Sequence, residues 1–248
     1  MKALNPEIKT FDSGDSLDRF AAETIISLAQ KAVSERDEFH LVLSGGGTPT
    51  PIYKLLAHSE FVGRLPWPQT HVYWGDERNV PAEDPGSNYG QVRTILLDRV
   101  PIPRTNIHRI KGELSPEEAA ADYRQQLRHL GIGQAPWPIF DVVMLGMGGD
   151  GHTASLFPGS IAPLEESTPI MAVQADYEDR PANRVTMTPL VFNTARCIIF
   201  IVKGHNKART VASVINGPLD RDRWPIHRIN PLSGKVLWLV DNEVAAGL

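Results

Sequence analysis

Residues His40–Pro51, HLVLSGGGTPTP, carry the signals of a strand, a turn and a helix in direct succession. The apolar run from His40 to Ser44 predicts a short β-strand, and the glycines that follow it predict a tight turn. Pro51 then falls at the start of a helix, a position that proline favours because its missing N–H would have no partner there. A strand that leads through a turn into a helix is the repeating unit of α/β proteins.

The same strand and helix signals recur along the rest of the chain. The expected strands are near-continuous apolar runs, which is typical of strands buried on both faces of a parallel sheet. We therefore expect an α/β fold with a mainly parallel, Rossmann-like sheet and helices on both faces. Further strands are expected at His71–Trp74, Phe140–Leu145, Cys197–Val202 and Val236–Val240, and helices at Asp15–Glu35, Pro51–His58, Asn88–Val100, from Ser115 to a stop at Gly131, and at Asn206–Asn216.

The domain organisation that we expect is a single domain over residues 1–248. No Ser/Gly-rich linker divides the chain, and such linkers are where domain boundaries usually fall. The proline-rich stretch Pro101–Pro103 and the run Asp176–Arg184 are the places that can bound a small appended lobe.

Composition and charge exclude several classes of protein. Lys and Arg number 25 against 29 Asp and Glu, so the net charge is −4, and no basic run is present to follow a phosphate backbone. We therefore expect no nucleic-acid partner. No uncharged apolar stretch approaches the ~18–20 residues of a membrane span, so no membrane association is expected either. The single cysteine, Cys197, lies in an apolar run, which predicts a buried thiol in a reducing compartment, the cytoplasm.

Ligands of parallel α/β sheets bind at the carboxyl ends of the strands, so the turns after the predicted strands are the candidate sites. The turn Ser44–Thr48 presents backbone N–H groups from Gly45, Gly46 and Gly47 ahead of a helix N-terminus, an arrangement that can bind a phosphate. The alternative is a tight turn that requires positive φ, but three glycines exceed what such a turn needs. No Gly-Lys-Ser/Thr follows, which excludes the phosphate loop of a nucleotide hydrolase.

Charged residues follow the next predicted strand. Asp76, Glu77 and Arg78 come almost directly after Trp74. They can bind a polar substrate, since the planar guanidinium of Arg78 suits oxyanions. They can equally form an ordinary solvated turn with a local ion pair, and the sequence leaves both interpretations open.

The loop Gly146–Thr153, after another predicted strand, carries Asp150 and His152. Its glycines match the dinucleotide-binding pattern, but Pro158 and Gly159 interrupt the full helix that such a site requires. His152, beside an expected helix start, is a candidate general base because the unperturbed pKa of histidine is ~6.5. The alternative is a histidine that only caps the helix or donates a hydrogen bond within the loop.

Lys207 lies at the expected N-terminus of the helix Asn206–Asn216, where its charge opposes the helix dipole unless an anion lies between them. This placement indicates a second phosphate contact, and the alternative is a surface lysine that extends into solvent.

The sequence motifs of other kinds of enzyme are absent. The chain has no Gly-x-Ser-x-Gly, and none of its eight histidines pairs with another at metal-ligand spacing, so we expect no metal site.

These turns together resemble the 6-phosphogluconolactonase family, which belongs to the same superfamily as the glucosamine-6-phosphate deaminases. The deaminases look similar around the glycine turns but typically have Asp-Glu-Tyr in place of Asp76-Glu77-Arg78, and Phe-Asn-Glu-Pro in place of Ser155–Pro158. Both differences favour the lactonase. The motifs that carry the resemblance are, in the family's order, Leu43–Pro49, Trp74–Arg78, Ser87–Tyr89, Phe140–Pro158, Arg184–Thr188 and Gly204–Lys207.

The resemblance implies a reaction and a substrate. The expected reaction is the hydrolysis of 6-phospho-D-glucono-1,5-lactone to 6-phosphogluconate in the oxidative pentose phosphate pathway, without a cofactor. The expected partner is this small sugar-phosphate lactone, and the chain is expected to be a monomer or a weak homo-oligomer. The alternatives are a phosphosugar isomerase or deaminase of the glucosamine-6-phosphate type, and a phosphosugar sensor without catalysis.

The resemblance also implies roles for individual residues. His152 is expected to activate water as a general base, and Asp150 to orient the imidazole or a substrate hydroxyl. Asp76 and Arg78 are expected to position the sugar ring. The phosphate is expected to bind to the turn Ser44–Thr48 together with Arg184 and Lys207.

Overall fold

The computed structural model describes residues 6–129, 137, 139–175, 180–231 and 233–248. Its centre is a seven-stranded sheet with the strand order β1-β10-β9-β6-β2-β3-β5, in which every neighbouring pair is parallel. This confirms the predicted class, a mainly parallel α/β fold. The strands are β1 Glu7–Phe11, β2 Phe39–Leu43, β3 Thr70–Trp74, β5 Ile107–His108, β6 Val142–Leu145, β9 Cys197–Val202 and β10 Lys235–Asp241.

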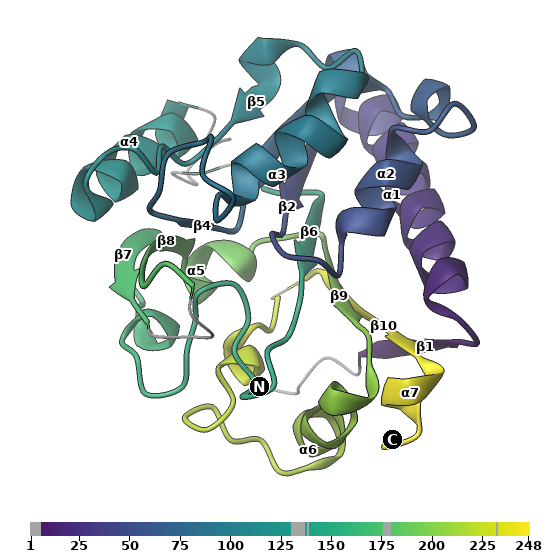
Figure 1. Ribbon diagram of the computed structural model, residues 1–248, viewed down its shortest axis with the longest axis vertical. Helices are drawn as coiled ribbons and strands as arrows, with labels where there is room; N and C mark the ends of the chain where they lie inside the picture. The colour runs from purple at the N-terminus through teal and green to yellow at the C-terminus, as the bar shows by residue number, and fades with distance from the viewer. Residues whose placement is uncertain (1–5, 130–136, 138, 176–179, 232) are drawn as a thin grey trace.

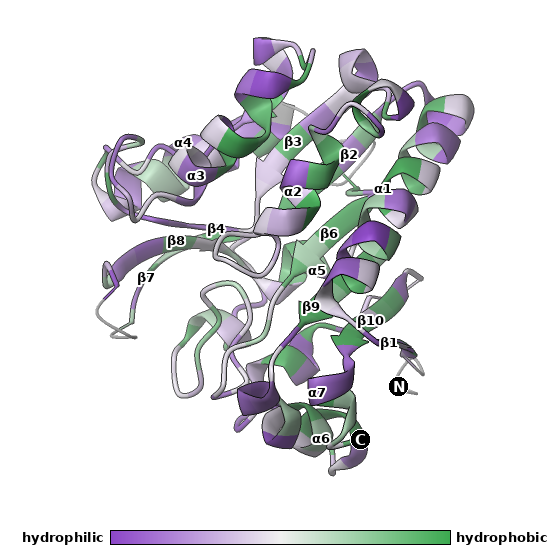
Figure 2. Ribbon diagram, turned by 45° about the vertical axis from the view of Figure 1, so that its right-hand side comes forward, coloured by the Kyte–Doolittle hydropathy of each residue, from purple (hydrophilic) through white to green (hydrophobic). Residues whose placement is uncertain are grey.

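Helices lie on both sides of this sheet. Figure 1 shows α1 (Gly14–Arg36) and α2 (Thr50–Leu56) to one side of β2, β6 and β9, with α4 (Pro116–His129) and α5 (Pro189–Phe192) to the other. The central strands β2, β6 and β9 are buried along their whole length, as their continuous apolar runs predicted, and Figure 2 shows β6 and β9 as hydrophobic. The remaining helices are α3 Asn88–Ile95, α6 Ala208–Asn216 and α7 Asn242–Ala245.

The predicted central strands and most predicted helices agree with the structure to within one or two residues, and the predicted helix stop at Gly131 lies outside the described residues. The expectation of a helix over Asn88–Val100 was wrong at its end. Helix α3 stops at Ile95 because Leu96 adopts φ −128° and ψ −65°, outside the helical region, and a short 3₁₀ turn, Leu97–Arg99, follows. The short strands β1 and β5 at the two edges of the sheet carried too little apolar sequence to be expected.

A second, smaller sheet lies beside the first. It consists of the antiparallel strands β4 (Asp76–Arg78), β8 (Asn183–Met187) and β7 (Ile170–Gln174). The interpretation of residues 76–78 as a solvated turn was therefore wrong, because these residues pair with β8 and all three are buried. Pro101–Pro103 and Asp176–Arg184 were the two stretches that could bound a small appended lobe. The chain between them contains β6, which lies at the centre of the main sheet.

The strand order reverses between β2 and β6. From β2 the chain adds β3 and β5 on one side, and then returns to place β6, β9 and β10 on the other. The loops that leave β2 and β6 at their carboxyl ends therefore diverge and leave a crevice, which is where open α/β sheets bind ligands.

The loop after β6 differs from the sequence prediction, which placed a helix start beside His152. Residues 146–161 form turns and an isolated bridge between Thr153 and Leu156 instead of a helix. The reason is in the backbone, because Gly151 and Ala154 have φ values of +81° and +48°, which a right-handed helix does not allow.

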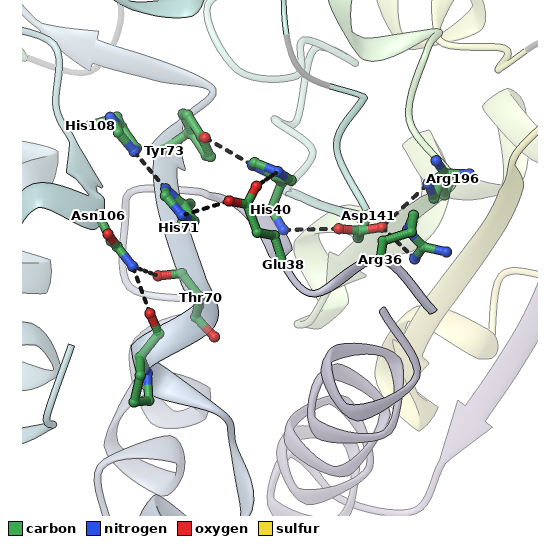
Figure 3. Close-up of polar contacts among 11 residues, drawn as sticks. Arg36, Glu38, His40, Thr70, His71, Tyr73, Asn106, His108, Asp141 and Arg196 are labelled. Carbon is green, nitrogen blue, oxygen red and sulfur yellow. Dashed lines mark hydrogen bonds and ion pairs between the residues drawn. The ribbon is translucent and has the colours of Figure 1, made fainter. Parts of the chain in front are cut away.

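The opposite, amino-terminal edge of the sheet holds a polar cluster in which His40 and Tyr73 are buried and His71 and His108 are partly buried (Figure 3). The rings of His40, His71 and His108, from β2, β3 and β5, stack in series. His71 Nδ1 lies 3.0 Å from His108 Nε2, and His40 Nδ1 lies 2.9 Å from the Tyr73 hydroxyl. Burial, and the nearby charges of His71 and His40, lower the pKa of His108 to about 4.

Cys197 is buried at the start of β9, as predicted, and burial raises the pKa of its thiol to about 11.

Within the described residues, no helix combines the length and the apolar character that crossing a bilayer requires.

Candidate active site

A cavity of about 340 Å³ opens at the switch point between β2 and β6. One wall is the glycine loop, residues 44–49 after β2, and the facing wall is formed by residues 145–148 and 152–154 after β6. Polar groups from other elements complete it. The remaining lining residues are Asp76, Asn88, Arg180, Ile201, Asn206 and Lys207.

The glycine loop is fixed at its start by Tyr53 of α2. The Tyr53 hydroxyl donates to the carbonyl of Ser44 at 2.7 Å and accepts from the backbone N–H of Ser44 at 3.0 Å. Gly46 has φ +88°, a conformation that favours glycine. All the predicted phosphate-loop residues, Ser44 to Thr48, therefore line the cavity, which agrees with their proposed role as an anion cradle.

His152 lies on the facing wall and is paired with Asp150. Its Nδ1 lies 2.6 Å from Asp150 Oδ1, which also accepts from the backbone N–H of His152 at 3.1 Å. The imidazole packs on the ring of Phe157, 4.4 Å between centroids. A Cβ on Gly148 would collide with the His152 ring, so only glycine at position 148 leaves room for the pair.

Asp150 remains ionised to a lower pH than an ordinary aspartate. Burial by itself would raise its pKa, but the hydrogen bonds and charge of His152 outweigh this effect, so that the pKa lies below its usual value. A negative charge on Asp150 stabilises the protonated imidazole and fixes which ring nitrogen faces the cavity. Asp150 itself is not among the lining residues, and therefore acts on the cavity through His152.

Asp76 and Arg78 lie on β4, two residues apart, and reach different spaces. The buried Asp76 lines the main cavity, and its Oδ2 accepts from the Ser155 hydroxyl at 2.7 Å. Arg78 donates from Nη1 to the carbonyl of Gly86 at 2.7 Å and lines a second cavity, of about 430 Å³, to which Gly46 and Gly47 of the glycine loop also contribute. Arg180 lines both cavities.

Glu77, between these two residues, was not expected to have a role of its own. Its carboxylate accepts from the backbone N–H groups of Arg78, Asn88 and Tyr89, each at 2.7 Å, and from the Ser87 hydroxyl at 3.2 Å. Burial raises the pKa of Glu77 to about 7 although these hydrogen bonds oppose the shift. Glu77 therefore joins β4 to the N-terminus of α3.

The two predicted basic phosphate ligands lie differently. Lys207 lines the cavity as predicted, at the N-cap position of α6, and lies close to Gly149. Arg184 is buried on β8, with its guanidinium 5.4 Å from the centroid of the Phe157 ring, and is not one of the lining residues. Sequence reasoning missed Arg180 and Asn88 as lining residues. Only the resemblance pointed near Asn88, through the motif Ser87–Tyr89.

The described residues contain no group of three or more His, Cys, Asp or Glu side chains that could hold a metal ion. The cavity instead combines cations, an acid and a histidine next to a glycine-rich loop.

The chain is thus a doubly wound α/β protein whose cavity joins a glycine-rich loop to an Asp–His pair. Comparison with known proteins gives the family. The sequence pattern of the family described as Glucosamine-6-phosphate isomerases/6-phosphogluconolactonase matches residues 12–238, and the chain belongs to this family.

The chain is similar to several named members over most of its length. A 6-phosphogluconolactonase from Nostoc sp. is 39% identical over 91% of this chain and 91% of the relative. Another, from Synechocystis sp., is 34% identical over 99% of both chains. The solved structure of the 6-phosphogluconolactonase from Trypanosoma brucei matches with a TM-score of 0.87 at 27% identity and covers 100% of both chains.

Proposed function

We propose that this chain hydrolyses 6-phospho-D-glucono-1,5-lactone to 6-phospho-D-gluconate, a step of the oxidative pentose phosphate pathway. Relatives that are 39% and 34% identical over nearly the whole chain carry the name 6-phosphogluconolactonase. The observation that carries the proposal is His152, backed by Asp150, in the same cavity as Lys207 and the glycine loop. A proton acceptor and an anion site within one cavity are what hydrolysis of a phosphorylated lactone requires.

His152 acts as the general base in this proposal. Because its Nδ1 is held by Asp150, Nε2 takes a proton from the attacking water, whose oxygen adds to the lactone carbonyl at C1. The tetrahedral intermediate then collapses, the bond between C1 and the ring oxygen breaks, and the imidazolium returns its proton to that oxygen. A lactone is an activated ester, so an oriented water, a base and charge stabilisation are sufficient and no cofactor takes part.

The remaining residues bind and orient the substrate. Asp76 accepts hydrogen bonds from hydroxyl groups of the sugar ring, and Arg78 supports the same ring from the second cavity, which shares Gly46 and Gly47 with the first. The phosphate binds to the backbone N–H groups of the loop Ser44–Thr48 and to Lys207, which share the cavity wall. Arg184 remains a predicted phosphate ligand, and its burial outside the lining of the cavity favours Lys207 over it.

The compartment that we propose for this enzyme is the cytoplasm. Its single cysteine is a buried thiol with a raised pKa, which suits a reducing compartment. It acts as one domain over residues 1–248, as a monomer or a weak homo-oligomer.

The test is lactone hydrolysis by the wild type and the His152→Ala variant side by side. The substrate is made fresh from glucose 6-phosphate, and 6-phosphogluconate is read by its coupled oxidation. We expect the wild type to exceed the spontaneous rate and His152→Ala to lose about 10²–10⁴-fold in kcat, the usual contribution of a general base. Equal acceleration by both proteins would remove His152 from the mechanism. No acceleration by either would exclude the lactonase, and ammonia release from glucosamine 6-phosphate would then be measured.

A further inference from the structure

Asn88, the first residue of α3, contacts two separate parts of the site. It is only 2% exposed and lines the main cavity. Its side-chain Nδ2 donates to the backbone carbonyl of Asp76 at 2.9 Å. Its Oδ1 lies so close to the glycine loop that a Cβ on Gly45 would collide with the Asn88 amide. One side chain therefore touches both the strand that carries Asp76 and the loop expected to bind phosphate.

The position of Asn88 is itself fixed by Glu77. One carboxylate oxygen of Glu77 accepts from the backbone N–H of Asn88, and the other accepts from Tyr89, the next residue of α3. Ser87 caps the same helix by accepting from the N–H of Gly90. With these bonds in place, the first turn of α3 cannot rotate without breaking several hydrogen bonds to a buried carboxyl group.

The chain of contacts continues from Asp76 to the wall that carries the base. Asp76 Oδ2 accepts from the hydroxyl of Ser155, three residues after His152. A path of direct contacts thus runs from Gly45 through Asn88 and Asp76 to Ser155, and joins the two walls of the cavity.

Asn88 keeps one polar atom without a partner. In the described part of the chain its Oδ1 is buried and accepts no hydrogen bond. A buried acceptor left in this state costs about 1–3 kcal/mol, so stability alone does not explain an asparagine here.

We infer, on the basis of the proposed function, that Asn88, held by Glu77, is a positioning residue that sets the glycine loop and Asp76 in register with each other. Asn88 acts through these two neighbours and needs no direct contact with the reacting carbonyl. The register matters because catalytic groups must be held within fractions of an ångström of the productive geometry, and a misplacement of about 1 Å can cost 10²-fold in rate.

The chain offers a matched control in Asn106. Asn106 is also a buried asparagine next to β3, and its Nδ2 donates to the backbone carbonyls of Thr70 and Pro68, each at 3.1 Å (Figure 3). Its bonds lie at the amino end of β3, whereas the bond from Asn88 lies beyond the carboxyl end. Asn88→Ala and Asn106→Ala thus both remove a buried amide that bonds the main chain, and only one of them adjoins the site.

The first experiment measures kcat and KM of both variants. The midpoint of urea unfolding is measured for each variant as well, to show how far the substitution destabilises the fold. We expect Asn88→Ala to lower kcat by about 10–100-fold and to raise KM for the phosphorylated lactone, while Asn106→Ala destabilises the fold and leaves kcat unchanged. Equal effects of the two variants on kcat, or full turnover by Asn88→Ala, would overturn the inference.

A second experiment tests the contact with Gly45 and is read by calorimetric binding of inorganic phosphate. Gly45→Ala should abolish phosphate binding in the wild-type background and be tolerated much better in Asn88→Ala, because the colliding amide is then gone. Equal harm in both backgrounds would refute the coupling. This measurement needs no turnover, so it tests Asn88 even if the wild type fails to hydrolyse the lactone, which would count against the proposed function alone.

Discussion

Replacing Asp150 with asparagine should slow lactone hydrolysis while the fold stays intact. Asp150 Oδ1 accepts from both Nδ1 and the backbone N–H of His152, at 2.6 and 3.1 Å. The amide oxygen of asparagine can accept both of these bonds, but it lacks the charge that stabilises the imidazolium formed when His152 takes a proton from water.

The size of the loss follows from the geometry. A hydrogen bond to a charged group contributes about 1.5–3 kcal/mol. The Asp150 side chain is 39% exposed, so solvent screens part of this energy and the lower end of the range applies. Since about 1.4 kcal/mol corresponds to tenfold in rate, we expect kcat to fall roughly 10-fold and by no more than about 100-fold.

The assay is the coupled oxidation of 6-phosphogluconate, with Asp220→Asn as the control. Asp220 also accepts from the backbone N–H two residues further on, at 3.2 Å, but its carboxylate contacts no catalytic histidine. We expect Asp220→Asn to keep full activity. Unchanged kcat in Asp150→Asn, or an equal loss in the control, would show that Asp150 does not support the base.

Further predictions concern the phosphate, the histidine cluster and the loop backbone. Lys207→Ala should raise KM for the phosphorylated lactone about 10–100-fold and spare unphosphorylated gluconolactone; equal losses on both would show that Lys207 does not contact phosphate. The pKa of His108, about 4 in the fold, lies below its unfolded value, so stability is full above pH ~6.5 and is lost as the pH falls towards 4. Urea unfolding of His108→Gln should show a weaker decline over this range, and an unchanged slope would contradict the assignment. Gly151→Ala combines φ +81° with a collision against Trp224 and should lower the free energy of unfolding by about 1–3 kcal/mol; a wild-type urea midpoint would count against this.

Much of the candidate site could be predicted because its residues follow directly after strong strand signals. The glycine loop after β2 and the loop that carries His152 after β6 both lie at carboxyl ends, and the parallel sheet brings those ends to one edge. Lys207 was found in the same way, from its place at the start of α6.

Other features depend on partners that are distant in the sequence. For residues 76–78 the sequence left a substrate-binding site and a solvated turn equally open, and only their pairing with β8 makes them a buried strand. Glu77 binds the N-terminus of α3 because β4 places it there, and nothing in the spacing of its neighbours reveals this bond. Arg184 was assigned to the phosphate by resemblance, whereas the antiparallel pairing of β8 buries it outside the lining of the main cavity.

Local sequence patterns were enough to predict the α/β class, five strands of the main sheet and five helices, and the chemistry available in the loops that follow those strands. These properties are local, since hydrophobic periodicity, caps and glycine turns act over a few residues. Packing of the whole chain sets which strands are neighbours. It therefore decided that the walls from β2 and β6 share one cavity, that Asn88 lies between Gly45 and Asp76, and that the histidines of β2, β3 and β5 stack. The physical reason is that strand order depends on how the whole chain buries its apolar faces, which no short stretch of sequence specifies.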